Sequence, residues 1–78
     1  MKAQDQYLQF VQWSGEDKAY IGYCPDLFPW GGVCHGATSV AAFTRLSEIV
    51  EDMVKTAQAQ GLALPPASTR PMREVVPA

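Results

Sequence analysis

The chain has 78 residues and a formal charge of −2, with 47% hydrophobic and 18% charged residues. This length suits one domain, and the balance of apolar to charged residues excludes intrinsic disorder. Free-standing nucleic-acid binders are usually basic, whereas this chain has a pI near 5.1. We therefore expect a folded domain that does not bind nucleic acid directly.

Neither a membrane segment nor a signal peptide is apparent. No apolar run approaches the roughly 20 residues that a membrane-spanning helix needs. The first residues, Met1 to Gln6, lack the apolar core of a secretion signal. These observations predict a cytoplasmic protein that has no membrane partner.

The first third of the chain is predicted to form an antiparallel hairpin. Residues 7–13 are rich in aromatic and β-branched side chains, which is typical of a strand. Residues 14–18 contain Ser, Gly and Asp and form a turn. A second strand is expected over 19–24 and ends at Pro25, because proline has no N–H to donate to a sheet.

A loop, a short strand and one long helix are expected next. The loop spans 25–32, the strand 33–35 and the helix 39–60. Thr38 or Ser39 can cap the first turn of the helix, and its length of about 33 Å carries its last turns beyond a sheet about 20 Å long. One apolar stripe along the helix is predicted from residues at three- and four-residue spacing: Val40, Phe43, Leu46, Ile49, Val50, Met53, Val54 and Ala57.

The helix is also expected to end at a defined point and to carry acids on its polar side. Gly61 suits a left-handed stop. Glu51 and Lys55 are placed for an i,i+4 ion pair. Acids on this side, which include Glu48 and Asp52, form either a surface for a basic partner or a solvated face.

Together these elements predict one α+β domain over residues 1–78, in which a single long helix packs on one face of an antiparallel sheet. Residues 72–76 are a possible additional edge strand. A helix covers only one face of such a sheet, so the other face meets either solvent or a partner.

The predicted first strand has large apolar side chains on both of its faces, more than packing against one helix requires. Along the first strand, Leu8 and Phe10 share one face. The other face has Tyr7, Val11 and Trp13. Half-exposed antiparallel strands normally alternate apolar with polar residues, so this pattern favours a homo-dimer, a higher oligomer or a complex. The loop aromatics are either interface anchors or a cover for the open end of the core. The candidate interface residues are Tyr7, Trp13, Phe28, Trp30 and His35.

Cys24, Cys34 and His35 are the only cluster of metal-ligand type. A structural zinc site needs four ligands at short paired spacings, so we expect neither a metal nor a cofactor. Cys34 and His35 are adjacent, and their side chains would point to opposite faces of a strand. A catalytic pair would require Cys24 to approach His35. The simpler interpretation is two buried free thiols, with a disulfide between them as the alternative.

The order of three short motifs resembles the HicB-like antitoxin domain. They are Tyr-Ile-Gly-Tyr-Cys-Pro-Asp-Leu at 20–27, Gly-Ala-Thr at 36–38 and Gly-Leu-Ala-Leu-Pro-Pro at 61–66. The resemblance covers residues 7–66 and implies a β-β-β-α-β domain with a truncated RNase H-like fold. It further implies a non-catalytic antitoxin that covers the active surface of a small, basic HicA-like toxin, an mRNA-cleaving ribonuclease.

The chain also departs from that family. The loop after Asp26 is longer, the helix entry lacks acids, and the chain ends before the DNA-binding domain that many members carry, so operator binding is not expected. The first strand has no acid, and Asp26 is a lone carboxylate that would bond its own turn, so a two-metal nuclease is excluded. The alternative function is an orphan domain that binds a small ligand or serves as an assembly module.

Overall fold

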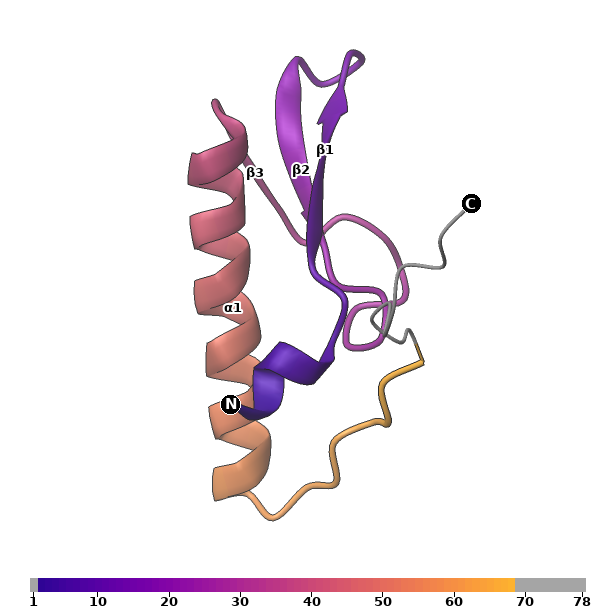
Figure 1. Ribbon diagram of the computed structural model, residues 1–78, viewed down its shortest axis with the longest axis vertical. Helices are drawn as coiled ribbons and strands as arrows, with labels where there is room; N and C mark the ends of the chain where they lie inside the picture. The colour runs from indigo at the N-terminus through magenta and orange to yellow at the C-terminus, as the bar shows by residue number, and fades with distance from the viewer. Residues whose placement is uncertain (1, 69–78) are drawn as a thin grey trace, which may run out of the picture.

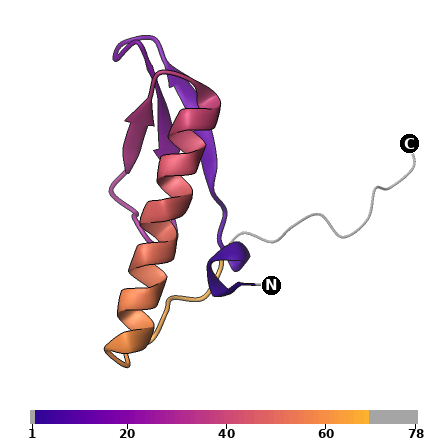
Figure 2. The same cartoon turned by 90° about the vertical axis from the view of Figure 1, so that its left-hand side faces the viewer.

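The computed structural model describes residues 2–68. Three strands form one antiparallel sheet in the order β1-β2-β3, and one long helix packs against a single face of it (Figures 1 and 2). This confirms the predicted α+β class. The elements in chain order are the 3-10 helix η1 (Ala3–Gln6), β1 (Phe10–Ser14), β2 (Ala19–Tyr23), β3 (Cys34–Gly36) and α1 (Ser39–Ala59).

The observed bounds differ from the predicted ones mainly at the N-terminus. Residues 3–6 form η1, which the sequence analysis did not predict, and the Tyr7 N–H closes it by donating to the Gln4 carbonyl at 3.3 Å. The first strand therefore begins at Phe10 instead of Tyr7. The predicted edge strand at 72–76 lies outside the described residues.

The turn between β1 and β2 is held by side-chain hydrogen bonds. The Ser14 hydroxyl donates to the Asp17 carboxylate at 2.8 Å and accepts from the Asp17 N–H at 3.2 Å. Lys18 has φ of 53°, in the left-handed region. The register that follows from this turn pairs Gln12 with Ile21 across the hairpin.

Both ends of α1 have the predicted caps. The Thr38 hydroxyl accepts from the Ala41 N–H at 3.0 Å, which satisfies one of the unpaired donors of the first turn. At the other end Gly61 has φ of 68°, and the Leu62 N–H donates to the Ala57 carbonyl at 2.8 Å. This pattern is a Schellman motif, which needs a residue such as glycine that tolerates positive φ.

The polar side of α1 carries the predicted ion pair. Lys55 Nζ lies 3.0 Å from Glu51 Oε1. Lys55 lowers the pKa of the Glu51 carboxyl through this contact. The pair is exposed and screened by solvent, so it contributes little to folding.

The core lies between α1 and the sheet, but its helical stripe is narrower than predicted. Val40 is 73% exposed and Phe43 is 44% exposed, so neither belongs to the core. The reason is local geometry, because the helix packs against the two glycines Gly22 and Gly36, where a Cβ would meet Leu46 or Ala42. The buried residues of α1 lie four apart along one line of the helix, and the first two of them contact these glycines: Ala42, Leu46, Val50 and Val54.

Candidate protein-binding surface

The strand register decides which side chains face away from α1. A Cβ on Gly22 would lie 3.1 Å from Leu46 Cβ, so Gly22 faces the helix. Its neighbours Ile21 and Tyr23 face the opposite side, because successive strand residues alternate. The residues paired with these two neighbours share that side. We call this surface the open face, and it consists of Phe10, Gln12, Ile21, Tyr23 and His35.

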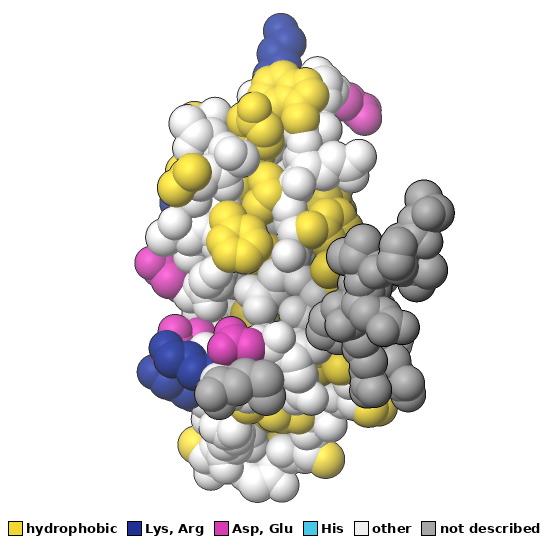
Figure 3. Space-filling view, viewed as in Figure 1, with side chains coloured by type: hydrophobic (Ala, Val, Ile, Leu, Met, Phe, Trp, Pro, Cys, Tyr) yellow, Lys and Arg dark blue, Asp and Glu magenta, His cyan; other side chains and the backbone are white. Residues whose placement is uncertain are grey.

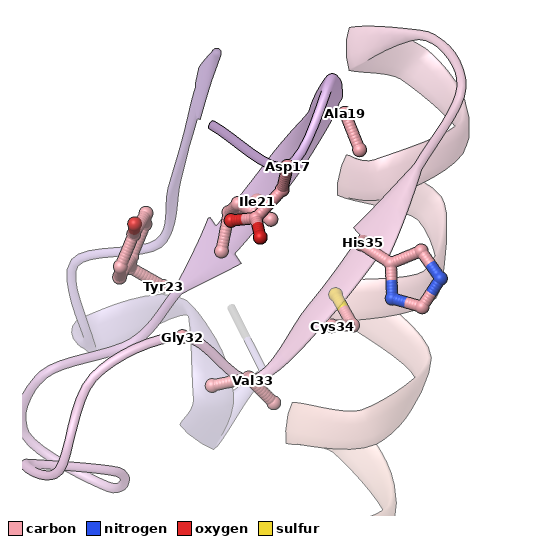
Figure 4. Close-up of a pocket in the computed structure, with 8 residues that line it drawn as sticks. All are labelled: Asp17, Ala19, Ile21, Tyr23, Gly32, Val33, Cys34 and His35. Carbon is pink, nitrogen blue, oxygen red and sulfur yellow. The ribbon is translucent and has the colours of Figure 1, made fainter. Parts of the chain in front are cut away.

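The open face has an aromatic edge and a shallow hollow. The rings of Phe10 and Tyr23 stack across β1 and β2 with centroids 4.9 Å apart. Beside them lies a hollow of about 560 Å³ between the hairpin turn and the loop before β3 (Figure 4). The loop before β3 lies close to β2, since a Cβ on Gly32 would lie 2.7 Å from Ile21 Cγ2. The lining residues are Asp17, Ala19, Ile21, Tyr23, Gly32, Val33, Cys34 and His35.

The predicted interface residues do not form one surface. His35 is exposed on the open face, opposite Ile21. Trp13 packs edge-on against Tyr20 at 5.1 Å, and both alternate with the open-face residues, so they lie on the helix-facing side. Trp13 remains 53% exposed there.

The two loop aromatics, which the sequence analysis left as either interface anchors or a cover for the core, differ in their burial. Phe28 is half-buried against the core, so it covers the open end as one alternative proposed. Trp30 meets Phe28 edge-on with centroids 5.5 Å apart but is itself 74% exposed. Trp30 therefore remains a candidate anchor, with the Phe28 ring in contact with it.

Tyr7 is a core residue, and its assignment to an interface was wrong. It is 4% exposed and belongs to the same apolar cluster as Leu46 and Val50. Its hydroxyl donates to the Pro65 carbonyl at 2.5 Å, which ties the segment after α1 to the segment before β1. The late start of β1 places Tyr7 before the sheet, where strand alternation does not apply.

Replacing Tyr7 by phenylalanine is expected to lower the free energy of unfolding by about 1 kcal/mol, since one hydrogen bond is lost and packing is kept. Burial, with the Asp26 and Cys24 charges, raises the pKa of Tyr7. A raised pKa in the folded state stabilises the fold below the unfolded value of about 10, and this is lost as pH rises through the folded value. Urea unfolding from neutral to alkaline pH should therefore show less alkaline loss in the variant, and equal loss would contradict this role.

The thiols and the imidazole lie on opposite sides of the sheet. Cys24 is fully buried in the core, and Cys34 donates through Sγ to the Ala42 carbonyl at 3.5 Å. Both cysteines are free, and burial raises the pKa of each thiol. A raised thiol pKa lowers the thiolate fraction and hence reactivity. His35 faces the open side, as predicted from its position next to Cys34.

Asp26 bonds a distant segment instead of its own turn. Its carboxylate accepts from both the N–H and the hydroxyl of Ser68, at 3.1 Å for the N–H. Its own turn is closed by the backbone, with the Phe28 N–H donating to the Cys24 carbonyl at 2.8 Å. Within residues 2–68 no three His, Cys, Asp or Glu side chains lie close enough together to hold a metal ion.

Comparisons with protein-family models, curated proteins and solved structures found no match. Over the described part of the chain, no helix has both the length and the apolar character needed to cross a membrane. The open face missed by the sequence analysis consists mainly of Phe10, Ile21 and Tyr23. The signal that identifies it is Gly22, a position within β2 where the lack of a side chain lets the helix approach closely.

Proposed function

We propose that this domain is a non-catalytic protein-binding module that acts in the cytoplasm as the antitoxin of a HicA-like, mRNA-cleaving toxin. The observation that carries the proposal is the open face. One helix covers one side of the sheet and leaves Ile21 and the Phe10–Tyr23 stack on the other. The sequence motifs that resemble HicB-like domains support the choice of partner.

The composition of the open face fits a protein partner. Interface cores are enriched in aromatic residues and depleted of charge, with polar groups at the rim. The open face has this arrangement, with apolar residues on β2 and the polar side chains of Gln12, Asp17 and His35 around them. Inhibition would be steric, because a partner whose catalytic surface is covered cannot bind its RNA.

The charge of the chain fits a basic partner. The formal charge is −2, and opposite net charges accelerate encounter between proteins. The acids Glu48 and Asp52 are exposed on α1, away from the open face. They therefore contribute to long-range attraction and not to contact, and their effect should weaken as salt is added.

Capture from the native cells tests this function. A tagged chain is expected to retain a small basic protein in stoichiometric amount, identified by mass spectrometry. Ile21→Lys should reduce this capture at least tenfold, since it places a charge at the centre of an apolar contact. Ala59→Lys is the matched control, because it adds the same charge at an exposed position near the end of α1. Both variants should melt as cooperative domains.

Equal capture by the two variants would show that the open face is not the binding surface. Recovery of the chain alone, as a folded monomer by light scattering, would contradict a binding function altogether. The domain would then have to function without a protein partner.

A second candidate, the assembly module, is favoured by the free edge of β1. Among the described residues β1 pairs only with β2, and its sequence Phe-Val-Gln-Trp-Ser has neither charge nor proline. Natural edge strands usually carry such residues to prevent pairing. Beside this edge Val11, Val40 and Phe43 line an apolar hollow, and apolar side chains gather along this side of the molecule (Figure 3). Self-association of the captured chain would support this candidate.

A further inference from the structure

The hollow on the open face has a charge at one end and apolar surface at the other. Among the described residues that line it, only Asp17 has a side chain that is formally charged at neutral pH. Ile21, Val33 and Tyr23 supply apolar surface further along the hollow, and His35 borders it from β3 (Figure 4).

The Asp17 carboxylate is held in place within the hairpin turn. Its Oδ2 atom accepts from the Ser14 hydroxyl at 2.8 Å, and the Asp17 N–H donates back to that hydroxyl at 3.2 Å. The left-handed conformation of Lys18 completes the turn. A carboxylate that is already ordered loses less side-chain entropy when it binds. One of its oxygen atoms, Oδ1, accepts no hydrogen bond within the described residues and is available to a partner.

We propose that this hollow receives an arginine side chain from an extended segment of the partner, followed two residues later by an apolar side chain. The proposal rests on the proposed function, because it names the chemistry of that partner. The guanidinium would bond Asp17 and lie over Ala19 beside His35. The apolar side chain would contact Val33 and Tyr23.

The spacing follows from strand geometry. Ala19 and Tyr23 are four residues apart along β2, which is about 13 Å at 3.3 Å per residue. Side chains two residues apart on an extended partner are separated by about 7 Å, which leaves about 6 Å of this length for the long arginine side chain to span toward Asp17 at the end of the hollow. Arginine fits better than lysine, because its flat guanidinium bonds a carboxylate and also packs on apolar surface.

A peptide titration followed by amide NMR tests the proposal on the whole chain. The probe is acetyl-Ser-Arg-Ser-Leu-Ser-amide at low ionic strength, and its control replaces arginine by the uncharged, similarly shaped citrulline. The arginine peptide is expected to shift amide signals along the hollow. Exposed ion pairs are weak, so citrulline should weaken binding about two- to fivefold. The signals expected to shift are those of Ala19, Ile21, Val33 and His35.

Two variants isolate the charge. Asp17→Asn keeps a side-chain oxygen for the Ser14 hydrogen bond but removes the charge, and it should reduce arginine-peptide affinity as much as citrulline does. Glu16→Gln removes a neighbouring exposed charge that does not line the hollow, and it should have a smaller effect.

The outcomes distinguish this inference from the proposed function. Equal affinity for the two peptides at the open face would overturn the preference for a cation and leave the open face as the binding surface. Shifts confined to α1, or no shifts at all, would overturn the inference. Loss of partner capture in Ile21→Lys would then still support the proposed function, which is measured independently.

Discussion

Replacing Leu46 by alanine is expected to lower the free energy of unfolding by about 3 kcal/mol. Leu46 is fully buried at the centre of the core, against the stretch of β2 around Gly22. Leucine-to-alanine changes at such positions cost about 2–5 kcal/mol, because the removed atoms lose their burial and leave a cavity. A domain of this size has a total stability of about 4–12 kcal/mol. The change therefore removes a large part of it.

Urea unfolding measures this effect, with stability taken from linear extrapolation. Val40→Ala is the matched control, since Val40 lies on the same helix but is 73% exposed. Its expected change is within about 0.5 kcal/mol. If both variants lost the same stability, Val40 would have to be packed in the core as Leu46 is. The face of α1 that the structure turns toward the sheet would then be wrong, and the broader apolar stripe predicted from the sequence would be right.

The sequence predicted the local structure well because local signals are strong. The hydroxyl of Thr38 and the backbone freedom of Gly61 define the two ends of α1, and the Ser14–Asp17 turn defines the hairpin. Each of these signals acts within a few residues. None depends on how the sheet and the helix meet.

The orientation of the sheet could not be predicted in the same way. Apolar residues occur on both faces of β1, so alternation alone does not show whether Phe10 or Val11 faces the helix. The decision is made at the partner position Gly22, where the absence of a side chain lets α1 approach. The role of Tyr7 was missed for a related reason. Its contact with Pro65 joins residues 58 positions apart, and no local pattern indicates that.

The exposure of Trp30 is a further feature that the sequence could not predict. The sequence of a glycine-rich loop does not show whether its tryptophan packs over the core or faces solvent. That depends on which loop side chain occupies the open end of the core. Phe28 fills it here. Trp30 is therefore left exposed, away from the residues that line the hollow.

Gly36→Ala is the second change expected to have a large effect. Gly36 lies where β3 ends and the chain turns into α1. A Cβ at this position would lie 2.6 Å from the Ala42 nitrogen and 2.9 Å from the Ala42 Cα. Both are backbone atoms of the helix, so no side-chain rotation relieves the overlap. We expect a loss of about 2–3 kcal/mol in the free energy of unfolding, as for other overpacked sites.

Gly15→Ala is the control for this prediction, because its Cβ would have Trp13 Nε1 at 3.8 Å as its nearest neighbour, an ordinary contact. Alanine there restricts the unfolded chain and should be neutral or slightly stabilising. Gly22 is intermediate, since a Cβ there would meet the Cys34 Sγ at 2.8 Å, a side-chain atom that can move. If Gly36→Ala unfolded at the same urea concentration as Gly15→Ala, the close approach of β3 to α1 would be wrong. The position of α1 on the sheet, which leaves the open face uncovered, would then need revision.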